Sequence, residues 1–137
     1  MKVLCLVIVI LGAFAATAAD LQPTITVRGP TIVAFFGPVS DAELKAHPDI
    51  NESLADFQYY AGGAGKALQN TEIDFHEIYV RSFRVRIGAK TTTFRVGKSG
   101  VGYYFVAPGK MPRVESGVLQ ASSILEIAEQ YFGKFRK

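Results

Sequence analysis

The only cysteine of the 137-residue chain, Cys5, lies in a leading segment that has the pattern of a secretory signal peptide. Lys2 makes the start of this segment positive, residues 3–16 form an apolar run, and the Ala-Thr-Ala of residues 16–18 is an A-x-A cleavage site. We therefore predict a signal peptide over residues 1–19 and a mature chain without cysteine. Such a chain has no disulfide bonds, so a packed apolar core must hold its fold together.

The apolar run of this leader is too short to stay in place as a membrane anchor. It has fourteen residues, whereas a spanning helix needs about 20. We expect cleavage, a periplasmic or secreted location and no transmembrane anchor in the mature protein. Residues 20–137 have the length of one domain. Their lack of cysteine excludes thiol redox chemistry, thiol nucleophiles and thiolate metal sites.

One continuous apolar run, Thr31–Phe36, is bounded by Pro30 and Gly37. A short run of this kind is typical of a strand buried on both faces, at the centre of a sheet with helices on either side. The alternating residues 24–27 before it predict an edge strand. Later strands are predicted over residues 72–80, 102–107 and 113–118, the last two joined through Pro108-Gly109.

Three helices are predicted from cap patterns and apolar spacing. Ser40 and Glu43 form a capping box that starts a short helix, which Pro48 stops. Asp49 and Glu52 repeat the cap pattern before a longer helix. The apolar stripe of that helix consists of Ile50, Leu54, Phe57, Ala61, Ala64 and Leu68. Ser122 and Ser123 are expected to cap a last helix, which Gly133 ends.

Three glycines, Gly62, Gly63 and Gly65, fall inside the predicted long helix. Each costs about 1 kcal/mol relative to alanine in a helix interior. They therefore either permit close packing or break the helix, and we favour close packing.

The clearest period of two lies between residues 82 and 96, where apolar and polar residues alternate. This pattern predicts two strands joined around Gly88-Ala89-Lys90, forming a hairpin with one apolar and one basic face. The basic residues of the hairpin and its margins are Arg81, Arg84, Arg86, Lys90, Arg95 and Lys98. They dominate a charge asymmetry: residues 20–77 contain nine acidic and three basic residues, whereas residues 78–137 contain three acidic and eleven basic ones.

The order of these elements resembles the thioredoxin-like fold over about two thirds of the mature chain. The resemblance rests on the buried strand that runs into a turn and a helix (TIVAFF-GPVS-DAELKA), the strand DFHEIYV, and the final hairpin and helix. It implies an α/β sandwich with a mixed central sheet, to which this chain adds the basic hairpin and a C-terminal helix.

The chain departs from the thioredoxin-like pattern at both hallmark sites. Residues 37–40, Gly-Pro-Val-Ser, stand where the family carries C-x-x-C, so only Ser40 remains where the second cysteine would be. Val101-Gly102 stands where the family has a cis-proline, and the hairpin replaces a segment that is usually helical. The resemblance therefore implies a redox-inactive relative.

Candidate catalytic groups are few. Ser40 could act as a nucleophile with His76 as base and Asp74 or Glu77 as the orienting acid, which would make the chain a hydrolase-type enzyme. His47 and His76 are far apart in sequence and have no ligand pair at helical spacing, so we predict no metal site and no cofactor.

The basic hairpin is the candidate binding site that we favour. Its guanidinium groups could meet carboxylates or phosphates in bidentate contacts, or they could simply keep a solvent-exposed strand from pairing with other chains. For an exported protein, the anionic partner would be an envelope polymer, a lipid headgroup or an acidic protein surface, and we expect no nucleic acid. We therefore predict a non-catalytic binding or scaffold module, with the Ser40 and His76 hydrolase as the alternative.

Overall fold

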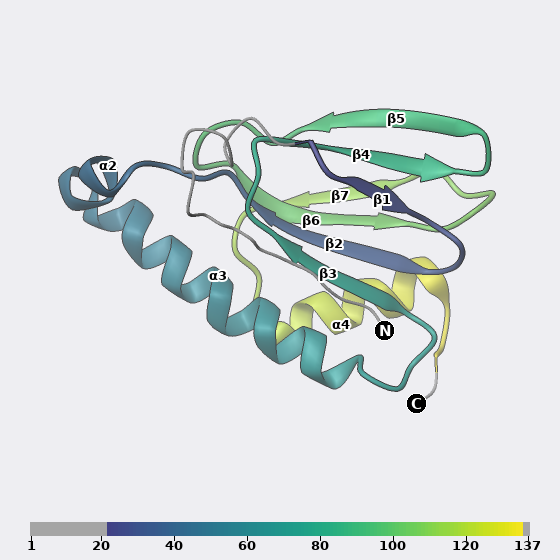
Figure 1. Ribbon diagram of the computed structural model, residues 1–137. Helices are drawn as coiled ribbons and strands as arrows, with labels where there is room; N and C mark the ends of the chain where they lie inside the picture. Colours follow the sequence, from purple (N-terminus) through teal and green to yellow (C-terminus); the bar gives the residue numbers. More distant parts are fainter. Residues whose placement is uncertain (1–21, 136–137) are drawn as a thin grey trace.

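The computed structural model describes residues 22–135 and shows a mixed α/β arrangement of two sheets and three helices (Figure 1). The predicted signal peptide, with Cys5, lies outside the described residues. The strands are β1 (Thr24–Thr26), β2 (Thr31–Phe36), β3 (Asp74–Ile78), β4 (Ser82–Ile87), β5 (Lys90–Arg95), β6 (Val101–Val106) and β7 (Arg113–Ser116). The helices are α2 (Asp41–Ala46), α3 (Pro48–Ala67) and α4 (Ala121–Phe132). Among residues 22–135, no helix is long and apolar enough to cross a membrane.

The strands form one sheet of four and one of three. The larger sheet has the order β3-β2-β6-β7, with β2 parallel to β3 and all other neighbours antiparallel. The smaller sheet has the order β1-β4-β5, with β1 parallel to β4 and β5 antiparallel to it. Figure 1 shows α3 and α4 below the four-stranded sheet and the three-stranded sheet above it. The described chain is therefore built in three layers.

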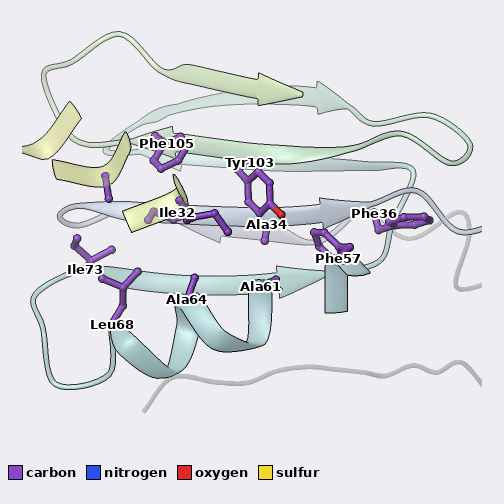
Figure 2. Close-up of a cluster of buried hydrophobic side chains, with 12 residues drawn as sticks. Ile32, Ala34, Phe36, Phe57, Ala61, Ala64, Leu68, Ile73, Tyr103 and Phe105 are labelled. Carbon is purple, nitrogen blue, oxygen red and sulfur yellow. The ribbon is translucent and has the colours of Figure 1, made fainter. Parts of the chain in front are cut away.

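The first core lies between the four-stranded sheet and the helices. Ile32, Ala34 and Phe36 point from β2 toward this core, where they meet residues of α3 such as Phe57 and Ala61 (Figure 2). Ile124 and Ala128 bring α4 into the same cluster. The predicted apolar stripe of α3 is thus the face that this core buries.

The second core lies on the opposite face of β2. Val33 and Phe35 pack there against the three-stranded sheet, above all against Phe83 and Val85 of β4. All six residues of β2 are buried, which confirms the predicted burial on both faces. The expectation of helices on either side is wrong, because the apolar face of the β4–β5 hairpin occupies the second side.

The start of α2 follows its sequence pattern, whereas the starts of α3 and α4 do not. Ser40 and Glu43 form the predicted capping box. In α3 the N-cap is His47 and Pro48 is the first helical residue, so the predicted Asp49 and Glu52 cap is wrong. Proline fits that position because its fixed φ suits the helix and its missing N–H would be unpaired there anyway.

The last helix begins at Ala121 with Gln120 as its N-cap, not at the predicted Ser122 and Ser123. The chain is held just before this point, because the Leu119 N–H donates to the Tyr103 hydroxyl of β6 at 3.4 Å. The helix ends before Gly133, as predicted, and the φ of +86° at that residue favours glycine.

The three glycines do not break α3, which continues to Ala67. At Gly65 an added Cβ would lie 3.1 Å from Cδ1 of Phe75 on β3, and at Gly63 it would lie 3.5 Å from Cβ of Ala121 on α4. The distance at Gly65 confirms close packing there, whereas the contact at Gly63 is an ordinary van der Waals contact that alanine would also make. Gly62 has no neighbour within 4 Å, so the prediction is wrong there.

Candidate functional site

The outer face of the three-stranded sheet carries a regular array of arginine and threonine side chains. In the strand register, Thr24 of β1 and Thr93 of β5 flank Arg84 of β4. Thr26 and Thr91 flank Arg86 in the same way, and Arg95 pairs with Ser82. Paired residues point to the same side of a sheet. Because Phe83 and Val85, which alternate with the arginines, face the second core, this array faces away from the rest of the molecule.

We call this surface the basic face and define it by Arg84, Arg86 and Arg95 with the threonines at positions 24, 26, 91 and 93. All seven residues are exposed. Arg28, also exposed, continues the alternation of β1 and adds a further cation that was not among the predicted binding residues. The alternation of residues 24–28 is the signal that could have found it.

Every charged residue of the three-stranded sheet and its flanking segments is basic. Residues 22–30 and 81–100 contain no aspartate or glutamate. The Arg84 guanidinium donates to the Gln22 carbonyl at 3.2 Å. Within residues 22–135, Arg86 and Arg95 form no side-chain hydrogen bond or ion pair. No residue in this part of the chain therefore neutralises either charge.

The other three predicted binding residues lie apart from the basic face. Lys90 pairs with Ile87 at the tip of the hairpin and so belongs to the opposite side of β5. Arg81 immediately precedes β4 and is exposed. Lys98 forms an ion pair with Glu43 of α2, with 2.5 Å between Nζ and Oε2. This contact, followed by the hydrogen bond from the Ser40 N–H, lowers the pKa of the Glu43 carboxyl below its ordinary value.

Residues 37–40 and the loop of residues 97–100 lie in direct contact at the end of β2. The Gly37 N–H donates to the Gly100 carbonyl at 2.7 Å, and the Ser99 N–H donates to the Gly37 carbonyl at 3.0 Å. An added Cβ at Gly37 would lie 1.7 Å from the Gly97 carbonyl oxygen, so the approach requires glycine. These hydrogen bonds tie residues 37–40 to the loop that leads into β6.

Ser40 and His76 do not form a catalytic pair in the structure. The Ser40 hydroxyl accepts the Glu43 N–H at 3.1 Å and thereby caps α2. His76 Nε2 lies 2.9 Å from Asp74 Oδ2, and no hydrogen bond joins His76 to Ser40 within residues 22–135. The register of β3 pairs His76 with Val33, whose side chain faces the three-stranded sheet. Ser40, by contrast, lies at the start of α2.

A small cavity of about 160 Å³ lies beside residues 37–40. Its lining consists of Phe36, Pro38, Val39, Leu44, Leu54, Gln58 and Tyr79. The Tyr79 hydroxyl donates to the Glu77 carboxylate, and burial raises the pKa of that phenol well above its ordinary value. The cavity is therefore apolar with a neutral phenol at its wall, and its lining offers no nucleophile or general base.

Metal ligands do not gather in the described part of the chain. Residues 22–135 contain no group of three or more histidine, cysteine, aspartate or glutamate side chains that could hold an ion. Two of the candidate donors, His76 and Asp74, contact each other on β3. No third donor joins this pair.

Comparison with known proteins adds no relative to this description. No family model, curated protein or solved structure matches the chain. The function must therefore be argued from the residues themselves.

Proposed function

We propose that this protein is a non-catalytic binding module that holds an anionic partner on the basic face. The observation that carries the proposal is the uniform sign of the charge on the three-stranded sheet: its exposed arginines have no acidic neighbour on their own sheet. The sheet itself supplies no counter-ion, so an external anion would neutralise it.

The chemistry of the basic face suits carboxylate or phosphate groups. A guanidinium presents paired N–H donors that match both oxyanions in bidentate contacts. Arg84 and Arg86 lie two residues apart on one strand, which separates their backbone positions by about 6.7 Å. Threonine hydroxyls on both neighbouring strands add further donors between the charges. Such a flat array suits an extended partner with repeated charges.

We further propose that the scaffold is a redox-inactive variant of the thioredoxin-like fold. The supporting observation is the order of β2, α3, β3, β6, β7 and α4, which together make one mixed sheet and the helical layer over it. The β4–β5 hairpin covers the sheet face that a helix covers in that family. Residues 22–135 contain no cysteine, and Val101-Gly102 stands where the family has its cis-proline, so neither residue type of the redox site is present there.

The proposed location is the periplasm or the exterior of the cell, which follows from the predicted signal peptide. The partner would then be a component of the cell envelope or a secreted molecule with dense negative charge.

The test is retention of the purified protein on two columns, one of immobilised polyglutamate and one of immobilised polyphosphate, eluted with rising salt. We expect the wild-type protein to be retained and the double variant Arg84→Glu with Arg86→Glu to pass through. The two columns tell carboxylate from phosphate recognition. The matched control is Lys66→Glu with Lys134→Glu, which changes the net charge equally at two exposed sites away from the basic face.

Equal elution of both double variants would show that only net charge matters, and the proposal would be wrong. Unchanged retention of the Arg84→Glu and Arg86→Glu variant would contradict it in the same way.

A further inference from the structure

The outer edge of β5 has no partner strand among residues 22–135. β5 is the last strand in the order β1-β4-β5, and no described strand lies on its other side. The Arg84 N–H donates to Pro23 and the Val27 N–H donates to the Arg86 carbonyl, each at 2.8 Å, so the even-numbered residues of β4 bond to β1. The odd-numbered residues of β4 therefore bond to β5.

This alternation decides which groups of β5 point outward. Lys90, Thr92 and Phe94 pair with the odd-numbered residues of β4, and the Val96 N–H continues the ladder to the Arg81 carbonyl at 2.8 Å. In an antiparallel ladder, the residues between such pairs turn their N–H and C=O groups to the other side. We define the β5 edge as the backbone groups of Thr91, Thr93 and Arg95, which point away from β4.

β7, the edge strand of the larger sheet on the side of β5, is not covered by the smaller sheet. Phe94 of β5 packs on Tyr104 of β6 and on Phe35 of the neighbouring β2, with 5.1 and 5.2 Å between ring centroids, so β5 lies over these two strands. The second core includes no residue of β7. Val114 of β7 pairs with Tyr104 and shares its side of the sheet. Tyr104 is only 5% exposed, whereas Val114 is 42% exposed. The smaller sheet thus ends one strand before the larger one.

A strand added to the β5 edge would cover β7. Neighbouring strands lie about 4.8 Å apart, so a strand paired to β5 would lie that much further toward β7. Its inward side chains would cover Val114, and its outward side chains would lie beside Arg95 on the basic face. Such a strand needs apolar and acidic residues in alternation.

A second copy of this chain does not suit the β5 edge. A second copy that paired through its own β5 would bring its larger sheet beneath that strand, into the space that β7 of the first copy already fills. The charge of the edge favours a partner of the opposite sign.

We propose that the β5 edge binds an extended acidic segment of a partner protein as a fourth strand of the smaller sheet. This inference rests on the proposed function and makes it specific, because backbone pairing adds to the charge recognition. The anionic partner is then a protein with an alternating acidic and apolar sequence, and not a polymer without a peptide backbone.

The first experiment measures amide hydrogen exchange in the wild-type protein with a peptide of about eight alternating glutamate and valine residues. We expect the peptide to slow exchange at the Thr91, Thr93 and Arg95 amides, which are otherwise free to exchange. A peptide with the same residues in two blocks should leave these amides unprotected, because it cannot present acids and valines on opposite faces.

The second experiment substitutes the central residue of the edge. Thr93→Pro removes one outward N–H and leaves the ladder to β4 intact, a position where a strand tolerates proline. We expect at least about a tenfold loss of affinity for the alternating peptide. Thr93→Val, which also lacks the hydroxyl but keeps the N–H, is the matched control and should bind the peptide more tightly than Thr93→Pro does.

The column experiment separates this inference from the proposed function. Thr93→Pro loses one hydroxyl of the basic face but keeps its three arginines, so polyglutamate and polyphosphate should retain it as strongly as Thr93→Val, which loses the same hydroxyl. Binding of both peptides without amide protection, or unchanged affinity in Thr93→Pro, would overturn strand addition while the proposed function stands. If Thr93→Pro does not fold, the exchange measurement on the wild-type protein decides alone.

Discussion

The helical layer and the three-stranded sheet use their charged residues in opposite ways. In the helical layer, Glu43 caps α2 together with Ser40 and holds Lys98 in an ion pair. On the three-stranded sheet, Arg86 and Arg95 have no such partner among the described residues, and no acid lies on the sheet. The Glu43 and Lys98 charges of the helical layer thus stabilise the fold, whereas the arginines of the three-stranded sheet are those that we propose for binding.

The largest expected loss of stability follows from a substitution on the inner face of β4, which packs against the larger sheet. Phe83 is fully buried between the sheets and packs on Phe35 and Phe94. We expect Phe83→Ala to lower the free energy of unfolding by about 3–5 kcal/mol, through lost apolar burial and a new cavity. Urea denaturation measures this change. A loss below about 1 kcal/mol would mean that the smaller sheet contributes little to the core.

A smaller loss of unfolding free energy is expected when the contact between Gly37 and the loop of residues 97–100 is disturbed. In Gly37→Ala the new Cβ would clash with the Gly97 carbonyl, a backbone atom that cannot move freely. Overpacking of this kind costs about 1–3 kcal/mol. The same denaturation measurement checks it, with Gly29→Ala as control because nothing lies within 4 Å of that position. Equal stability of the two variants would show that the loop relaxes without cost.

The contribution of the Glu43 contacts to the free energy of unfolding should decrease as the pH falls. The pKa of this carboxyl is lowered in the folded protein, so the ionised form favours folding. The stabilisation is present above the unfolded-state pKa and is lost as the pH falls through the lowered folded pKa. We expect Glu43→Gln to flatten the acid side of the curve of unfolding free energy against pH. Asp41→Asn on the same helix is the control, and equal curves would contradict the assignment.

The smallest effect on stability is expected for the variant that has the largest effect on binding. Arg84→Glu with Arg86→Glu changes only exposed side chains on the outer face of β4. Surface substitutions of this kind usually change the free energy of unfolding by less than about 0.5 kcal/mol. Thermal denaturation should therefore show a transition close to that of the wild type. A large loss would mean that these arginines serve the fold, and the comparison between the two regions would fail.

Local patterns predicted much of the fold because they depend on neighbours in the chain. The apolar run Thr31–Phe36 predicted the buried strand β2, and the Ser40 and Glu43 pair predicted the start of α2. The alternation around Gly88 predicted the β4–β5 hairpin with its two unlike faces. The predicted caps of α3 and α4 are wrong because Ser, Asp and Glu can occur in the first turn of a helix without being its N-cap. The structure places His47 and Gln120 there instead.

The candidate site was predictable only in part. The period of two placed Arg84, Arg86 and Arg95 on one face, and the register agrees. It could not show that Lys98 is held by Glu43, since fifty-five positions separate the two residues in the chain. Nor could it show that Ser40 and His76 have separate partners, because contacts across such distances depend on how the layers assemble.

By itself, the sequence determined the strands, the hairpin and the uniform basic charge of residues 81–100, because periodicity and charge are properties of short segments. Only the tertiary structure decided that a sheet, and not a helix, covers the second face of β2. It also decided that the smaller sheet does not extend over β7, so that no described strand pairs with the outer edge of β5 and Val114 is exposed beside it. The reason is physical: strand order and layer stacking arise from pairings between distant segments, whose free energies no local pattern contains.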